Sequence, residues 1–198
     1  MASTTTNIPC DVKNFEVADM GKKRIEWANQ SMKVLQIIRK EFIKNQPLKG
    51  IRVSVMRLPQ VHDTVKQGII TPAIEIAREK GVSAYVGEGR NRWAAAHISD
   101  VARLYRLALE RNEAGAKYHG VAEEGVPMRD IAEAIGRRLK LPVKSISAEE
   151  ASAHFGWLAM FAARDLLASS EKTRKKLGWN PTGPGLIADL EELPVSGR

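Results

Sequence analysis

Segments typical of β-strands alternate with segments typical of α-helices along most of the chain. Runs rich in β-branched residues are separated by runs whose apolar residues recur every three or four positions, as in amphipathic helices. This alternation predicts an α/β fold with some parallel strand pairing, because parallel neighbours need a long crossover that is usually a helix. The expected strands are 51–58, 84–86, 116–122 and 143–146, and the expected helices are 71–80, one from Ser99, 127–139, 170–177 and 186–193.

Capping residues mark the ends of two of these helices. Thr71 is expected to be the N-cap of the helix over 71–80, with Pro72 at its first position and Gly81 just past its end. Ser99 is expected to cap the following helix in the same way. These residues predict where the helix over 71–80 begins and ends and where the next helix begins.

A further amphipathic helix is expected near the N-terminus, over about 22–45, with Asp19 as its N-cap and Pro47 after its end. Residues 1–52 hold ten Lys and Arg against five Asp and Glu, so most of the net charge of +8 lies there. A basic helix either binds nucleic acid or presents a solvated basic face. We favour the solvated face and expect no specific nucleic-acid partner, because no zinc-finger spacing or RNA-recognition signature accompanies the charge.

The composition excludes several classes of protein. With 43% hydrophobic and 27% charged residues, the chain has the balance of a soluble globular protein. No apolar run approaches the ~18 residues needed to cross a bilayer, and the N-terminus lacks the regions of a secretory signal. The single cysteine, Cys10, cannot form an internal disulfide, which favours a reducing compartment. We therefore expect a cytoplasmic protein with no membrane partner.

The sequence carries no recognisable catalytic or metal-binding motif. A dinucleotide fingerprint needs three spaced glycines, whereas Gly87 and Gly89 are followed by Arg92 at the third position. The four histidines show no spacing typical of a metal site, so neither a metal nor a catalytic residue is predicted. The Tyr-x-x-x-Lys pair of short-chain dehydrogenases is also missing, because the residues four after the three tyrosines are Gly89, Leu109 and Ala122.

Several polar residues remain candidates for ligand binding. Pro59 and His62 follow a predicted strand, and open α/β sheets bind ligands at the carboxyl ends of their strands. His97 either contacts a substrate or cofactor or is a packed histidine bonded to a neighbouring loop. Arg90 and Arg92 lie in a glycine-rich loop, where they either grip a phosphate or carboxylate by forked hydrogen bonds or are ordinary surface arginines.

The N-terminal segment resembles S-adenosylhomocysteine hydrolases. The resemblance is carried over about 40 residues by Phe15–Asp19, Gly21–Ala28 and Pro47–Arg52. In that family the segment forms the first helix and leads to the first strand of the substrate domain. The family's Cys-Leu-His segment is replaced at 55–58, and its catalytic residues lie beyond the match, so the resemblance does not imply hydrolase activity.

The rest of the chain, from about residue 50 to 193, resembles the C-terminal part of extended short-chain dehydrogenase/reductases of the NAD(P)-dependent epimerase/dehydratase type. The resemblance implies a partial Rossmann-like sheet with the helical substrate lobe of that family, preceded here by the added amphipathic helix. The motifs that carry it are Val55–Pro59 with Val61-His62, Val86–Gly89, Ala96–Ala102, Ser170, Thr173, and Leu177–Trp179 with Pro181.

The second resemblance also implies where ligands would bind. Cofactor-binding residues are expected at Pro59, Val61 and His62, in the loop that lies near the nicotinamide ribose in the family. Substrate-binding residues are expected at Arg90, Arg92 and His97. The cofactor would be NAD or NADP, bound weakly or not at all, because the family's glycine fingerprint and its Tyr/Lys pair are missing. Asp63 departs from the glycine often found at its position.

Together these features predict a disordered or extended segment over 1–18, an amphipathic helix and turn over 19–49, a dehydrogenase-like lobe over 50–193 and a frayed tail over 194–198. The function expected is that of a truncated, non-catalytic relative of the oxidoreductases, with an unknown small-molecule substrate. The alternative is a protein-interaction module whose basic helix and exposed sheet edge bind another protein. A fused gene fragment without a function is also left open. Its partner would be a second copy or a complementing subunit.

Overall fold

The computed structural model describes residues 33–46 and 49–194 of the chain. It divides into two compact units, Met1–Ile51 and Arg52–Arg198. The first unit contains α2 (Lys33–Asn45), which confirms the second half of the predicted N-terminal helix. The predicted N-cap Asp19, the first half of that helix and the segment over 1–18 lie outside the described residues.

The second unit has an α/β fold, as predicted. Its strands form two parallel pairs and a three-stranded mixed sheet, in which the middle strand pairs in parallel with one neighbour and antiparallel with the other. The pairs are β1 (Val55–Arg57) with β5 (Lys117–His119) and β3 (Ser83–Val86) with β7 (Val143–Ile146); the mixed sheet is β2 (Gln60–His62), β4 (Arg92–His97) and β6 (Glu123–Pro127).

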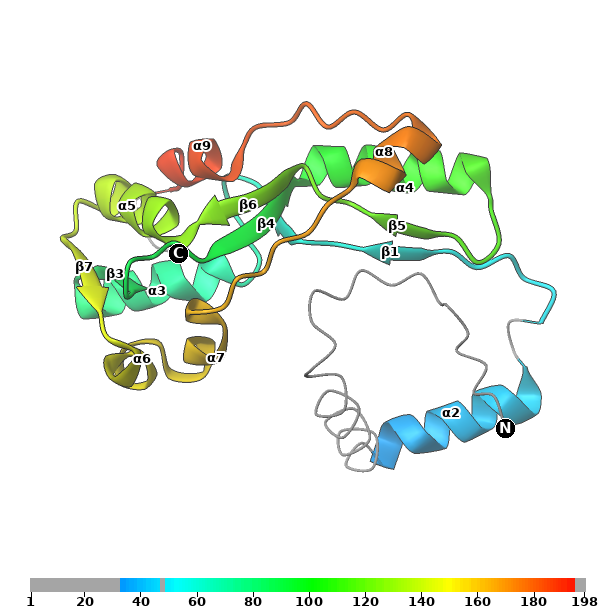
Figure 1. Ribbon diagram of the computed structural model, residues 1–198, viewed down its shortest axis with the longest axis horizontal. Coiled ribbons are helices and arrows are strands. Elements are labelled where there is room, and N and C mark those ends of the chain that lie inside the picture. The colour runs from blue at the N-terminus through cyan, green and yellow to red at the C-terminus, as the bar shows by residue number, and fades with distance from the viewer. Residues whose placement is uncertain (1–32, 47–48, 195–198) are drawn as a thin grey trace, which may run out of the picture. The chain divides into compact units, whose positions relative to one another are not determined.

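Helices follow the strands along the chain (Figure 1). None of the described helices is long and apolar enough to span a bilayer. The helices of the second unit are α3 (Ile70–Lys80), α4 (Ile98–Arg111), α5 (Met128–Leu139), α6 (Ala148–Phe155), α7 (Ala159–Ala162), α8 (Glu171–Leu177) and α9 (Leu186–Glu191), with a 3-10 turn over Gly156–Leu158.

Two predicted helix caps are wrong, and one is confirmed. α3 begins one residue earlier than predicted, and the Thr71 hydroxyl accepts the Gln67 amide at 2.9 Å instead of capping the helix. α4 is capped by His97, whose Nδ1 accepts the Ser99 amide at 3.2 Å. A histidine competes with serine here because its ring nitrogen is also an acceptor. Gly81 ends α3 with φ of 67°, as expected for a glycine after a helix.

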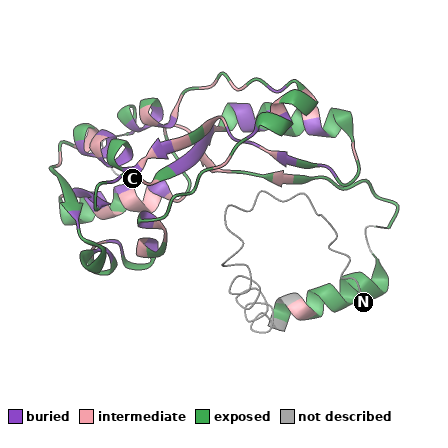
Figure 2. Ribbon diagram, viewed as in Figure 1, coloured by how far each residue is buried: buried purple, intermediate pink, exposed green. Residues whose placement is uncertain are grey.

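The main core of the second unit lies where α3, α5 and α9 pack around β3 and β4. Figure 2 shows β4 as buried along most of its length. Trp93 on β4 is nearly inaccessible, as are Ile131 of α5 and Leu186 and Leu190 of α9. Burying large apolar side chains supplies most of the free energy of folding, so this end of the unit holds most of its stabilising contacts.

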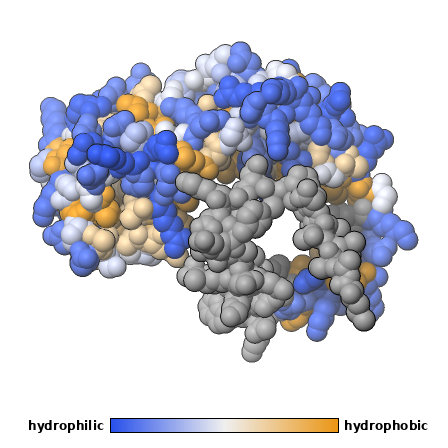
Figure 3. Space-filling model, in the orientation of Figure 1, coloured by the Kyte–Doolittle hydropathy of each residue, from blue (hydrophilic) through white to orange (hydrophobic). Residues whose placement is uncertain are grey.

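A smaller apolar cluster lies between α4 and the β1–β5 pair. It consists of Ala108, Ala116 and Tyr118, with Met56 and Leu177 packed against it. Nearby apolar side chains remain exposed, among them Val53, Val55 and Leu109. Figure 3 shows one face of the molecule, on which hydrophilic residues predominate over the part occupied by α4 and α8.

The buried carboxylate of Asp100, in the first turn of α4, anchors the segment that follows α8. Its oxygens accept the amides of Thr182 at 3.0 Å and Gly183 at 2.9 Å, and they pair with the Arg103 guanidinium. The Trp179 indole donates to the Asp100 carbonyl at 3.0 Å. A single residue therefore ties α4 to a segment about 80 positions later in the chain.

Candidate functional site

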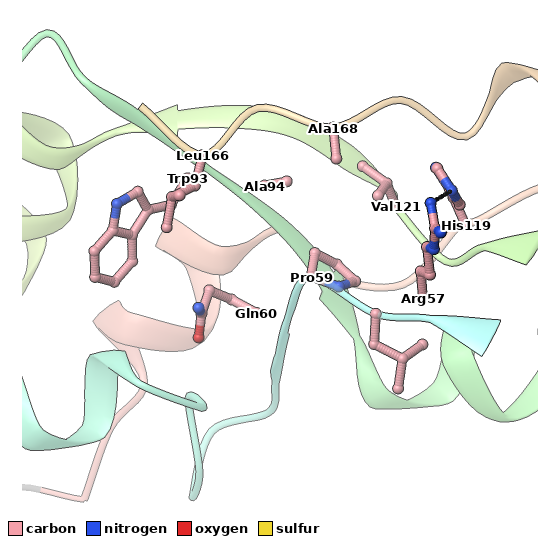
Figure 4. A pocket seen from close by; sticks show the side chains of 10 residues that line it. Arg57, Pro59, Gln60, Trp93, Ala94, His119, Val121, Leu166 and Ala168 are labelled. Atoms are coloured by element: carbon pink, nitrogen blue, oxygen red, sulfur yellow. Dashed lines mark hydrogen bonds between the residues drawn. The ribbon is translucent and has the colours of Figure 1, made fainter. Parts of the chain in front are cut away.

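A cavity of about 300 Å³ opens where the carboxyl end of β1 meets β2, β4 and β5 (Figure 4). Its walls are mainly apolar, and small side chains at Ala94 and Ala168 leave the space open. Ligand pockets typically begin at about this volume and are lined by apolar groups with a few polar ones. The lining residues are Arg57, Leu58, Pro59, Gln60, Trp93, Ala94, His119, Val121, Leu166 and Ala168.

The segment between α7 and α8 forms one wall of this cavity. Leu166 pairs with β4 as an extra extended residue: its amide donates to the Arg92 carbonyl at 2.7 Å, and its carbonyl accepts the Ala94 amide at 3.1 Å. Ala168 is held by the Glu124 carbonyl at 3.3 Å. The wall is therefore fixed by backbone hydrogen bonds rather than by side-chain packing alone.

Arg57 and His119 form the polar end of the cavity. They are the last residues of the paired strands β1 and β5 and are direct partners in the register. Arg57 Nη1 lies 3.5 Å from His119 Nε2, and His119 Nδ1 lies 3.2 Å from the Ser169 carbonyl oxygen. Since a carbonyl only accepts, Nδ1 carries the proton, and in the neutral ring Nε2 is the acceptor that faces Arg57.

The opposite end of the cavity holds Gln60 and Trp93, whose polar atoms bond to the backbone. Gln60 Oε1 accepts the Ile69 amide at 2.9 Å, and the Trp93 indole donates to the Arg164 carbonyl at 3.1 Å. Figure 4 shows these side chains away from Arg57 and His119, with Pro59 between the two ends. The two ends of the cavity therefore differ in chemistry.

His62 is placed in a separate, buried cluster. Its side chain is fully buried, and its Nδ1 lies 2.6 Å from Oδ2 of Asp189 in α9. Its Nε2 has no hydrogen-bond partner among the described residues and lies 3.9 Å from the Glu123 carboxylate. The His97 ring lies 5.7 Å from the His62 ring, edge to face. The structure thus brings together two of the predicted site residues, away from the pocket lining.

The other predicted residues lie apart from one another. Val61 is half-buried in β2 opposite Ala96 and does not line the cavity. Arg92 pairs with Asp165, 3.4 Å away, at the start of β4. Arg90 has 85% of its side chain exposed and pairs with Glu88 at 2.8 Å. Of the six predicted residues, only Pro59 lines the cavity.

Asp63 shapes the turn that follows β2. Its carboxylate accepts the amides of Val65 and Lys66, each at 2.7 Å. These two backbone hydrogen bonds hold the pKa of Asp63 below its ordinary value, since they favour the ionised form. Asp63 thus builds a local turn.

Sequence reasoning missed Arg57 and His119 as site residues. A signal was available only for Arg57, which lies near the end of the predicted strand 51–58, whereas His119 falls in the middle of the predicted strand 116–122. The register that makes them neighbours is a tertiary property. Glu123 and Asp189 were missed as well. Adjacent acids such as Glu123-Glu124 usually lie in solvent, whereas here Glu123 accepts the Leu186 amide at 2.8 Å. No group of His, Cys, Asp or Glu within the described ranges is arranged to hold a metal ion.

Comparison with known proteins supports both resemblances. A family model described as S-adenosyl-L-homocysteine hydrolase matches residues 9–99, which extends beyond the 40 residues that carry the resemblance. The adenosylhomocysteinase of Aquifex aeolicus is 52% identical over 44 residues, 22% of this chain and 10% of that protein. The N-terminal segment is thus similar to a small part of these hydrolases.

Solved structures identify the fold of the remainder. A dTDP-glucose 4,6-dehydratase of Streptomyces venezuelae, DesIV, aligns with a TM-score of 0.54 and 17% identity, covering 73% of this chain and 44% of that one. The epimerase Mth375 of Methanothermobacter thermautotrophicus aligns with a TM-score of 0.57 and 17% identity, covering 82% and 47%. The chain carries part of an epimerase/dehydratase fold.

Two curated yeast proteins are similar at the sequence level. An uncharacterized protein of Schizosaccharomyces pombe, C2A9.02, is 48% identical over 143 residues, 72% of this chain and 48% of that protein. An uncharacterized protein of Saccharomyces cerevisiae, YLL056C, is 41% identical over 163 residues, 82% of this chain and 55% of that protein. The chain spans about half the length of these relatives.

Proposed function

We propose that the chain is a truncated, non-catalytic relative of the NAD(P)-dependent epimerase/dehydratases that keeps their substrate lobe and binds a small molecule in the β1–β5 cavity. The observation that carries this proposal is the convergence of Arg57, Pro59 and His119 on a cavity at the carboxyl ends of two paired parallel strands. Open α/β sheets bind their ligands at that edge. We place this function in the cytoplasm, on the strength of the single cysteine.

The absence of catalysis in this proposal follows from the residues at the cavity. Reduction or oxidation of a substrate needs a general acid or base within hydrogen-bond reach of the reacting oxygen. The 198 residues contain no Tyr-x-x-x-Lys pair and no glycine fingerprint. Of the residues that line the cavity, His119 is the acid/base side chain. Its Nδ1 lies on the Ser169 carbonyl and its Nε2 faces the Arg57 guanidinium, so in this proposal it positions a ligand and transfers no proton.

The cofactor in this proposal is NAD or NADP, bound weakly or not at all. DesIV was solved with NAD bound, and Pro59, which the resemblance assigns to the loop near the nicotinamide ribose, lines the cavity. The buried His62 is turned toward Asp189, so its ring offers nothing to a ligand in the cavity. We therefore expect contact with the cofactor at Pro59 and none at the His62 side chain.

Backbone amide NMR of the whole chain, titrated with NAD, NADP and small ring compounds, tests this function. Ligand binding should shift the signals of Gln60, Ala94 and Ala168, and no hydride transfer to or from the nucleotide should appear at 340 nm. Ala168→Trp should fill the cavity and abolish the shifts, whereas Ala102→Trp, on the exposed face of α4, should leave them unchanged. Turnover of a nucleotide, or shifts that survive Ala168→Trp, would contradict the proposal.

A second candidate function, protein interaction, is favoured by the free edge of β1. The carbonyl of Val53, the amide of Val55 and the carbonyl of Arg57 all bond toward the β5 side. Because alternate residues of a strand direct their backbone groups to opposite edges, the amides and carbonyls of Ser54 and Met56 face the other edge. That edge pairs with no other strand of the described part of the chain. An unpaired edge beside exposed apolar residues favours addition of a strand.

The partner in this alternative is a second copy of the chain or a complementing subunit. Sedimentation of the purified chain measures the first case directly. Self-association that is abolished by Val53→Lys with Val55→Lys would support the edge as the interface. A monomer at all concentrations, which also fails to bind the separately produced part of the S. pombe relative that this chain does not cover, would exclude this role for the edge.

A further inference from the structure

The polar end of the cavity presents positive charge without a carboxylate to balance it. Arg57 forms no ion pair with any Asp or Glu of the described residues, and the hydrogen bond found for its side chain is the 3.5 Å contact with His119. Arg92, which precedes the lining residue Trp93, is by contrast paired with Asp165. A guanidinium that contacts only an imidazole keeps most of its five donors available.

The geometry of this end suits an anion. Arg57 and His119 extend from adjacent strands at the same register position, and Figure 4 shows their side chains side by side at one end of the cavity lining. A guanidinium binds a carboxylate or phosphate by two parallel hydrogen bonds. His119 can add a donor from Nε2 when its ring is protonated, while Nδ1 stays on the Ser169 carbonyl.

The remainder of the cavity suits an apolar body. Between the polar end and Trp93, the walls are formed by Pro59, Ala94, Val121 and Leu166. The polar atoms of Gln60 and Trp93 already have backbone partners. The volume of about 300 Å³ exceeds the roughly 150 Å³ that holds a benzene ring in a protein interior. A six-membered ring with one substituent therefore fits.

We propose that the cavity selects small organic anions, compounds with a ring or short hydrocarbon body and one carboxylate or phosphate group, and that Arg57 and His119 hold the anion. This inference rests on the proposed function, because it names the ligand class of the same cavity. Arg57 carries the permanent charge and sets the orientation, with the ring of the ligand directed toward Trp93. His119 adds a second donor from Nε2 in the protonated form of its ring.

The test compares benzoate with benzyl alcohol, which has the same ring but no charge, by NMR titration of the whole chain. Benzoate should bind at least about tenfold more tightly, since hydrogen bonds to charged groups are worth about that factor. Phenyl phosphate shows which anion is preferred. Competition with NAD shows which natural ligand supplies the anion. Displacement of benzoate by NAD assigns the anion site to the cofactor's phosphates, and no displacement assigns it to a substrate.

Three variants isolate the two residues. Arg57→Gln should remove the preference for benzoate, and His119→Asn should reduce it while keeping a donor for the Ser169 carbonyl. Arg106→Gln, which removes an equal charge from the exposed face of α4, should change nothing. If Arg57→Gln does not fold, the salt dependence of ligand binding by the wild type tests the anion site. Sodium chloride should lower the affinity for benzoate and leave the affinity for benzyl alcohol unchanged.

The outcomes separate this inference from the function on which it rests. Equal affinity of the wild type for benzoate and benzyl alcohol, or an undiminished preference in Arg57→Gln, would overturn the anion site and leave the cavity as a ligand site. Failure of every probe to shift the signals of Gln60, Ala94 and Ala168 would overturn the proposed function itself.

Discussion

The two ends of the larger unit differ in how completely they are packed. At the β3–β4 end, three helices bury large apolar side chains such as Trp93 and Leu190. At the β1–β5 end, the buried cluster holds two alanines and a tyrosine, and apolar residues nearby are exposed. The first end stabilises the fold. The second end, with an open cavity and a free strand edge, is the part available for ligands or partners.

The largest contrast should come from removing one leucine at each end. Leu190→Ala should destabilise the protein by about 2–5 kcal/mol, because the side chain is fully buried and its loss leaves a cavity. Leu109→Ala, where 77% of the residue is exposed, should change stability by less than about 0.5 kcal/mol. Urea denaturation measures both, and equal losses would show that the two ends contribute alike.

The buried pair of His62 and Asp189 should have the next largest effect. Asp189→Ala leaves His62 Nδ1 without its partner, which should cost about 1–3 kcal/mol for a buried polar group. Glu192→Ala, which removes an exposed acid directly after the last residue of α9, is the matched control. In a double-mutant cycle with His62→Phe, independent effects of the two substitutions would show that the contact does not stabilise the fold.

Proline substitutions at neighbouring positions test the two edges of β1. Val55→Pro removes the amide that donates to the Ala116 carbonyl at 2.8 Å, so a loss of about 1 kcal/mol or more in unfolding free energy is expected. Ser54→Pro removes an amide on the free edge and should cost less. The comparison is made by urea denaturation of both variants beside the wild type. A larger loss from Ser54→Pro would mean that the outer edge of β1 is already paired.

The smallest expected effect is a pH dependence at the packed end. Burial, with the nearby charges of Lys80 and Lys144, lowers the pKa of His154. The unfolded chain, with an ordinary histidine pKa of about 6.5, therefore binds the proton more readily than the folded one. Stability should fall as the pH drops below that value, and His154→Gln should reduce the slope between pH 7 and pH 5. Parallel slopes for the two proteins would contradict this assignment.

Local patterns in the sequence predicted the elements better than the contacts between them. The strand over 143–146 and the glycine that ends α3 are where the sequence places them, because β-branched residues and a positive φ act locally. β6 is not among the predicted strands, since Glu123, Glu124 and Gly125 have low strand preference and pair only because β4 lies beside them. The predicted caps of α3 and α4 failed because the Thr71 hydroxyl accepts the Gln67 amide, and because His97 caps α4 by accepting the Ser99 amide.

In the candidate site, too, the sequence predicted single positions better than the contacts between distant residues. Pro59 was predicted from its position after a strand, and it lines the cavity. Arg57 and His119 are 62 residues apart in sequence, and nothing in either segment specifies that they share a register position. His62 and His97 were each predicted as ligand contacts, and the structure brings them together around Asp189, which gave no signal in the sequence.

Asp100 has a consequence for how the molecule opens. Its carboxylate and carbonyl hold Trp179, Thr182 and Gly183 against the start of α4, so the segment after α8 cannot detach while α4 stays in place without exposing a buried charge. Proteins unfold locally in cooperative units, and we expect the start of α4 and the segment after α8 to belong to the same unit. Their amide hydrogens should exchange with deuterated solvent at a common rate, although three strands and four α-helices separate them along the chain.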